Sequence, residues 1–98
     1  LPLELPDIIS GWHMYVIRVK DLSQPLQLYP YIKRGGIGVN LHYPPVYSHP
    51  YYREHGYAKT QCAVADLYGA TAITLPLHLS LTRSDVKVIC AMIKNFFR

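Results

Sequence analysis

Two different periods of apolar and polar residues run along this chain, and each predicts a different kind of element. The segment Trp12–Val19, WHMYVIRV, is rich in aromatic and β-branched residues, and both of its alternating faces are apolar. It is therefore predicted to be a central strand. Ile37–Leu41 alternates aliphatic with small or polar residues, which predicts a half-buried strand. Ile73–Leu77, ITLPL, is a third predicted strand, and Pro76 favours an edge position because proline cannot donate a ladder hydrogen bond.

Helical spacing predicts a first helix within Asp21–Arg34. Pro25 suits its first turn, Pro30 is expected to kink or restart it, and Gly35 is expected to terminate it. The predicted apolar stripe consists of Leu22, Leu26, Tyr29 and Ile32.

Two further helices are predicted in the second half of the chain. Thr60–Ala72 carries a stripe of small residues that would allow close approach to a sheet: Cys62, Ala65, Gly69 and Ala72. In the last helix Thr82 is the expected N-cap, with Asp85 as its capping partner and Leu81 positioned for a hydrophobic staple with Val86. The buried stripe of this helix is predicted to be Val86, Ile89, Ile93 and Phe97, with Cys90 at its margin.

This order of elements predicts one domain over residues 1–98. Its expected class is α/β (α+β), a small two-layer sandwich in which a three-stranded sheet has helices on one face. A chain of 98 residues suits a single small domain. Its apolar runs are shorter than the roughly 18–20 residues that span a bilayer, so no membrane segment is expected. The absence of an initiator Met suggests a trimmed piece of a longer protein.

Charge and cysteine content narrow the functional classes. The net charge is +4, but the ten basic residues are scattered, which does not favour nucleic-acid binding. Cys62 and Cys90 are expected to be buried free thiols in a reducing, cytoplasmic compartment, although a disulfide between them stays an alternative.

The sequence contains no recognisable catalytic or metal-binding motif. His42, His49 and His55 lack the spacing and the additional ligands of a zinc site. Neither cysteine is expected at a helix N-terminus, where a thiol becomes reactive. His13, within the first strand, is expected to be a hydrogen-bonded core histidine. No catalytic residue and no metal ligand are therefore predicted.

One stretch is unusually dense in polar aromatic residues: GIGVNLHYPPVYSHPYY, from Gly36 to Tyr52. If the aliphatic face of Ile37–Leu41 meets the core, Asn40 and His42 project together from the opposite face. Pro44 and Pro45 then end the strand and are expected to leave a stiff loop as far as Tyr57.

Three segments resemble a known family: SGWHMYVIRV, GIGVNLHYPPVYSHPYYREHGY and ITLPLHLSLT. They are similar to the C-terminal part of the DegT/DnrJ/EryC1/StrS family of sugar aminotransferases that use pyridoxal phosphate (PLP). The similarity is strongest to the branch of UDP-4-amino-4,6-dideoxy-N-acetyl-altrosamine transaminases. It implies the small C-terminal domain of the aspartate-aminotransferase fold.

The resemblance also carries expectations about the site. The cofactor-binding large domain, with its Schiff-base lysine, would be absent, so this chain is expected to hold no PLP and to be inert alone. His42 and Tyr43 are expected to hydrogen-bond sugar or phosphate oxygens of a UDP-sugar, with Tyr47, His49 and Tyr51 as further candidates. The missing N-terminal domain and a homodimer partner are implied, and the parent enzyme is expected to be cytoplasmic.

Two alternatives stay open from the sequence. The chain could be a stand-alone module that binds a nucleotide sugar or dimerises without catalysis. It could also be a basic RNA-binding domain, an interpretation that rests only on charge and tyrosines. Titration with a UDP-sugar distinguishes the aminotransferase and stand-alone hypotheses from the RNA-binding one.

Overall fold

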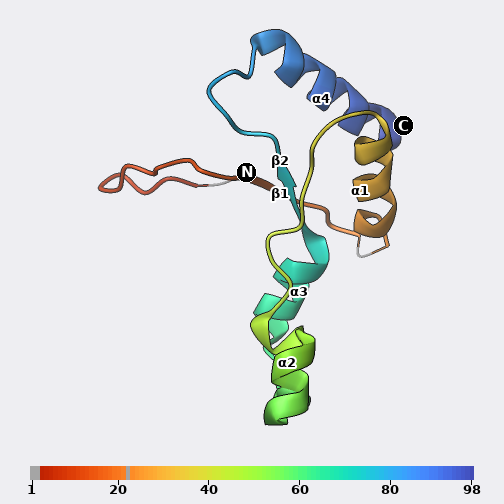
Figure 1. Cartoon of the computed structure of the whole chain (residues 1–98). Helices are drawn as coiled ribbons and strands as arrows, with labels where there is room; N and C mark the ends of the chain where they lie inside the picture. The colour runs from red at the N-terminus through yellow and green to blue at the C-terminus, as the bar shows by residue number, and fades with distance from the viewer. Residues whose placement is uncertain (1–2, 22) are drawn as a thin grey trace.

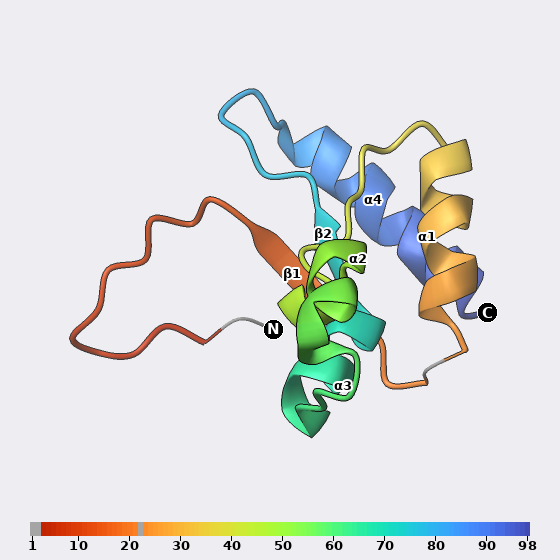
Figure 2. The ribbon, with the colours of Figure 1, turned by 60° about the horizontal axis from the view of Figure 1, so that its bottom comes forward.

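The computed structural model describes residues 3–21 and 23–98 as a small α+β unit with a two-stranded antiparallel sheet (Figure 1). An extended arm precedes the sheet, and two helices pack together on one side of it (Figure 2). The remaining helical segments lie beyond the end of the sheet (Figure 1). In chain order the elements are β1 (Tyr15–Arg18), α1 (Pro25–Arg34), the 3₁₀ turn η1 (Val46–Ser48), α2 (Pro50–Tyr52), the wide turn η2 (Arg53–Tyr57), α3 (Ala63–Thr71), β2 (Ala72–Leu75) and α4 (Arg83–Phe96).

The sheet differs from the predicted one in both size and order. β1 pairs with β2, and the predicted strand Ile37–Leu41 contributes only a single bridge, between Asn40 and Thr74. The Asn40 N–H donates to the Thr74 carbonyl at 3.1 Å, and the Thr74 N–H donates to the Asn40 carbonyl at 2.8 Å. β2 therefore lies in the middle, and the predictions of a central β1 and an edge β2 were wrong. Pro76 does not disturb the pairing of this middle strand, because β2 ends at Leu75 and residue 76 is not required to donate a ladder hydrogen bond.

The core lies between the sheet, α1 and α4. Ile73 of β2 packs on the same side as the two helices, whereas Thr74 points to the opposite face because strand side chains alternate. The ring centroids of Tyr31 on α1 and Phe96 on α4 are 5.3 Å apart, so these two rings pack between the helices. The buried cluster consists of Val19, Leu28, Ile32, Val39 and Ile73.

The predicted helices exist, but the face that each one buries was partly mispredicted. α1 runs through Pro30 without restarting, and its buried side is formed by Pro25, Leu28 and Ile32. Leu26, predicted to face inward, is 82% exposed, and Leu22 lies outside the described residues. The inward face of α1 is the one that meets β2 and α4.

α4 confirms the predicted N-cap and its capping partner. Thr82 and Asp85 form a reciprocal capping box, in which each side chain accepts from the other residue's backbone N–H. The stripe was rotated relative to the prediction: Val86 and Phe97 are exposed, and the residues that meet the core are Ile89, Met92, Ile93 and Phe96.

The end of α1 depends on one glycine, and it is not the predicted one. Gly36, not Gly35, adopts the left-handed conformation, with φ of +81°. The Gly36 N–H donates to the Lys33 carbonyl at 3.1 Å and the Ile37 N–H donates to the Ile32 carbonyl at 3.3 Å, which together form a Schellman motif. Only glycine adopts this conformation without a steric penalty.

Replacing Gly36 by alanine is expected to lower the free energy of unfolding by about 1–2 kcal/mol, the cost of a left-handed L-residue. No atom lies within 4 Å of the added Cβ, so the effect would be purely conformational. Urea unfolding followed by circular dichroism measures it. Gly38→Ala is the matched control, because its Cβ also enters open space and its φ is not positive. An equal loss in both variants would contradict the assignment.

Much apolar surface remains uncovered. The Cα radius of gyration is 15.7 Å, compared with about 13 Å for a compact domain of this length. The predicted close approach of α3 to the sheet was wrong, because α3 meets Pro45 and Tyr47 instead and its Val64 is 83% exposed. Within the described residues, none of the helices has the length and apolarity needed to cross a membrane.

Candidate functional site

The polar aromatic segment lies along β2 and α3 in the antiparallel direction. Asn40 pairs with Thr74, Pro45 lies against Gly69, and Tyr47 bonds to Asp66. In Figure 1 this segment passes down beside α3 before it enters α2. The predicted stiff loop is thus largely helical between residues 46 and 57, because His49 is extended and Pro50 then starts a new turn.

His42 and Tyr43 form the part of the site that touches the sheet. The His42 Nδ1 is hydrogen-bonded to the Thr74 Oγ1 at 3.1 Å, on the face of β2 opposite the core. The two rings are 4.6 Å apart and tilted by 47°. His42 is half-buried, and Tyr43 is 65% exposed, so the pair presents one anchored imidazole and one accessible phenol.

Tyr47 is engaged within the protein. Its hydroxyl donates to Asp66 Oδ1 at 2.6 Å and accepts from the Cys62 backbone N–H at 3.1 Å. The same N–H also lies 3.2 Å from Asp66 Oδ2. The hydrogen bond to the Asp66 carboxylate favours the protonated phenol and raises the pKa of Tyr47 to about 12.

His49 and Tyr51 lie further along the segment. His49 caps the 3₁₀ turn and precedes α2, and it is exposed. Tyr51 stacks on His55 with ring centroids 4.1 Å apart, and the His55 Nδ1–H donates to the Tyr51 carbonyl at 2.6 Å. Tyr52 meets the Tyr51 ring edge-on at 5.3 Å, which extends the array of exposed rings.

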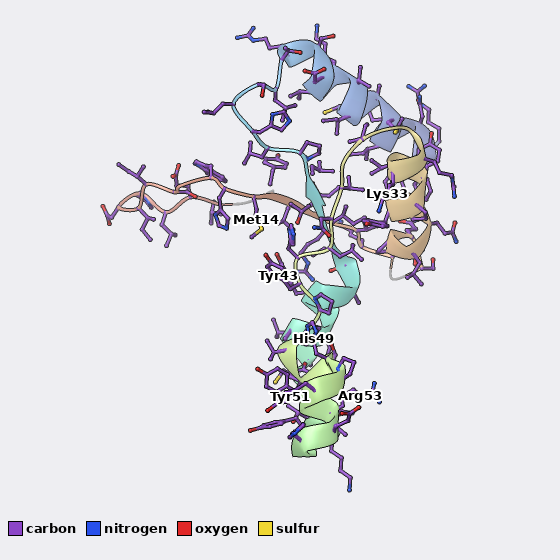
Figure 3. The ribbon with its side chains drawn as sticks, in the orientation of Figure 1. Met14, Lys33, Tyr43, His49, Tyr51 and Arg53 are labelled. Carbon is purple, nitrogen blue, oxygen red and sulfur yellow. The ribbon has the colours of Figure 1, made fainter. Side chains whose placement is uncertain are left out.

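The five predicted site residues therefore fall into separate groups. Figure 3 shows Tyr43 near the sheet, His49 further from it, and Tyr51 of α2 further still. The sequence did not predict the residues that contact His42, Tyr47 and Tyr51, which are Thr74, Asp66 and His55 respectively. Only the last of these had a local signal, because Tyr51 and His55 are four residues apart, the spacing that brings side chains together on a helix.

Other residues singled out in the sequence lie elsewhere. His13 is exposed, not a core residue, because β1 begins only at Tyr15; it lines a cavity of about 460 Å³ with Trp12, Arg18 and Tyr68. Cys62 and Cys90 are both exposed free thiols, so the prediction of buried cysteines was wrong. Cys62 is the N-cap residue of α3, again contrary to prediction. In residues 3–21 and 23–98 no three His, Cys, Asp or Glu residues gather closely enough to hold a metal ion.

Comparison with known proteins identifies the class to which this fold belongs. The chain superposes on DesV of S. venezuelae, solved in complex with a ketimine intermediate, with a TM-score of 0.81 and 26% identity, covering 100% of this chain and 26% of that one. It also superposes on Helicobacter pylori PseC, described as an aminotransferase involved in the biosynthesis of pseudoaminic acid, with a TM-score of 0.79 and 22% identity, covering 87% of this chain and 23% of that one. The fold is thus that of a segment of aminotransferase chains.

Residues 3–94 match the DegT/DnrJ/EryC1/StrS aminotransferase family, and the chain belongs to that family. A curated relative is the spore coat polysaccharide biosynthesis protein SpsC of Bacillus subtilis (strain 168), which is 26% identical over 93 residues. That match covers 90% of this chain and 24% of the relative. The chain therefore spans about a quarter of the length of the relatives it matches.

The residues present do not fit covalently bound PLP. A Schiff-base lysine is desolvated within a pocket, where its amine loses its proton readily. All five lysines of this chain are exposed, and Lys33 lies over the Tyr29 ring at 5.5 Å. No chemical step through the cofactor can be assigned to these residues. His42 and Tyr43 offer an imidazole and a phenol for binding.

Proposed function

We propose that this chain is the small C-terminal domain of a PLP-dependent aminotransferase that acts on nucleotide-linked 4-keto-6-deoxy sugars. The family match over residues 3–94 is the observation that carries the proposal. The segment from Gly36 to Tyr57 and the likeness to PseC and SpsC support a role in surface glycan biosynthesis, in the UDP-4-amino-4,6-dideoxy-N-acetyl-altrosamine transaminase branch. The cofactor and its lysine then belong to a large N-terminal domain, and this chain is inert alone.

The uncovered apolar surface supports this role. Leu79 and Ile9 are almost fully exposed, and Val64 protrudes from α3. A monomeric protein rarely leaves extended apolar patches in water, because such patches favour association. A large domain and a second subunit of a homodimer would cover part of this surface in the parent enzyme.

His42 and Tyr43 are the residues we assign to the nucleotide sugar. The bond from Nδ1 to Thr74 leaves the other imidazole nitrogen for a sugar or phosphate oxygen, and the exposed Tyr43 hydroxyl adds a second hydrogen-bonding group. His49 and Tyr51 are assigned to more distant parts of the same ligand, since they lie further along the segment. Tyr47 contributes through its contacts to α3.

A stand-alone module is the second candidate, and the same exposed apolar side chains favour it. Such a module would bind a nucleotide sugar or pair with itself, without any reaction. The two candidates differ in whether a separately expressed cofactor domain of a family member restores transamination when mixed with this chain. Restoration supports the domain assignment, and its absence with retained sugar binding favours the module.

Titration with UDP-N-acetylglucosamine tests the site. Binding is expected to shift the ¹H–¹⁵N signals of His42 and Tyr43 most strongly, with smaller shifts at His49 and Tyr51. Uridine and inorganic phosphate, titrated separately, show which half of the ligand is responsible. Shifts confined to another region, or salt-sensitive RNA binding in place of sugar binding, would reject the assignment. Addition of PLP is expected to produce no stable absorbance band at visible wavelengths.

A further inference from the structure

Contacts from β2 and α3 fix the segment that carries the proposed site. Thr74 holds His42, Gly69 lies against Pro45, and Asp66 holds Tyr47. The partners are met in reverse order, so the segment runs antiparallel to them. The contact at Asp66 comes from a residue that no sequence motif had marked.

Asp66 is placed to receive two donors at once. Its Oδ1 accepts from the Tyr47 hydroxyl at 2.6 Å, and its Oδ2 lies 3.2 Å from the Cys62 backbone N–H. Asp66 lies in the first turn of α3, so both of its oxygens are close to the N-terminal end of that helix. The single hydroxyl proton of Tyr47 is used in this bond, so it cannot be donated to a ligand unless the bond to Asp66 breaks.

Gly69 completes the contact surface on α3. It follows Asp66 by three residues and therefore lies on the same side of the helix. A Cβ at this position would lie 2.8 Å from Pro45 Cδ and 3.4 Å from the Tyr43 carbonyl oxygen. The proline ring cannot rotate away, so the backbone of residues 43–45 approaches α3 this closely only because residue 69 is glycine.

We propose that Asp66 is a positioning residue, which holds residues 43–47 on α3 through Tyr47 and so sets the orientation of the His42–Tyr43 pair toward substrate. Its relevance to substrate rests on the function proposed above, whereas the contact itself does not. The sheet contact of His42 fixes one end of the backbone that carries Tyr43, and the contact of Tyr47 with Asp66 fixes the other end.

The titration of Tyr47 reports this contact directly. The groups facing its hydroxyl are the Asp66 carboxylate and the backbone and thiol of Cys62, and the hydrogen bond to Asp66 is the largest cause of the raised pKa. The folded pKa lies above the usual value, so the contact is fully present below about pH 10 and is lost as pH rises through about 12. The His42–Tyr43 signals should move over the same alkaline range.

The test compares Asp66→Asn with Asp85→Asn in the full chain. Asp85 is the matched control, since it is also an exposed helix-terminal carboxylate bonded to a neighbouring hydroxyl, here that of Thr82. Tyrosine labelled with ¹³C at Cζ is titrated by NMR, and Tyr47 is assigned with Tyr47→Phe. Asp66→Asn is expected to lower the Tyr47 pKa from about 12 toward 10 and to shift the His42 and Tyr43 signals without ligand. Asp85→Asn should change neither.

The affinity of each variant for UDP-N-acetylglucosamine tests whether Asp66 also affects ligand binding. Losing one oriented contact is expected to weaken binding about threefold to tenfold in Asp66→Asn, with no change in Asp85→Asn. An unchanged Tyr47 pKa, or unchanged His42 and Tyr43 signals, would overturn the positioning role whatever the ligand does. Gly69→Ala, which displaces Pro45 without altering charge, should shift the same two residues. If the unsubstituted chain fails to bind the sugar, the proposed function fails separately, and the ligand-free shifts still decide the role of Asp66.

Discussion

Replacing Ile73 by alanine is expected to lower the free energy of unfolding by about 2–5 kcal/mol, the usual cost of truncating a large aliphatic residue in a core. Ile73 is 0% exposed and lies in the middle of β2, where its side chain meets Leu28 and Ile32 of α1. Small domains have only about 5–15 kcal/mol of stability in total. The variant should therefore be close to unfolded at 37 °C, and its folded fraction can be compared with that of the unsubstituted chain at the same temperature.

Chemical denaturation monitored by circular dichroism measures this loss. Val64→Ala is the matched control, because Val64 is also aliphatic but is 83% exposed on α3. It should change the free energy of unfolding by no more than about 0.5 kcal/mol. Similar midpoints for the two variants would show that β2 is not the centre of the core.

The second large effect is expected at His42. Replacement by alanine removes the anchored imidazole and should weaken UDP-N-acetylglucosamine binding about tenfold to a hundredfold, since hydrogen bonds to charged groups contribute about 1.5–3 kcal/mol. Isothermal titration or the NMR titration gives the ratio of dissociation constants. The half-buried position of His42, against Thr74, explains why the imidazole would be held ready for the ligand.

His78→Ala provides the control for this measurement. His78 is an exposed histidine on the loop before α4, where its Nδ1 lies 3.3 Å from the Ser80 hydroxyl. Its removal should leave sugar affinity unchanged. Equal affinities for the parent chain and His42→Ala, with both folded, would remove His42 from the site.

Local sequence signals predicted the elements that local interactions determine. The capping box of Thr82 and Asp85 follows from two residues three positions apart, and the basic end of α1 followed by glycines marked its C-terminus. The alternation also placed Ile37 and Val39 correctly with the core, whereas Leu41, the third aliphatic residue of that pattern, is 41% exposed. In each case the interacting residues are only a few positions apart, or the spacing of the apolar residues itself shows which face is buried.

Tertiary contacts determined what the sequence could not show. β2 became the middle of the sheet because Asn40 bonds to Thr74, 34 positions away, and no periodicity encodes such a partner. The helical turns at 46–57 were missed because prolines and aromatic residues are poor helix formers, although Pro50 suits a first turn. The bonds of Tyr47 to Asp66 and of His42 to Thr74 likewise join segments whose proximity only the fold reveals.

β2 joins the interior and the proposed site through two neighbouring residues. Ile73 fills the interior on one side, while Thr74 holds an imidazole on the other. A shift of this strand by one residue would turn each side chain to the other face of the sheet. Ile73 would then leave the core, and Thr74 would lose His42. The Thr74 contact of His42 therefore depends on the same strand register that fills the interior, and loss of that register would release the imidazole together with the core.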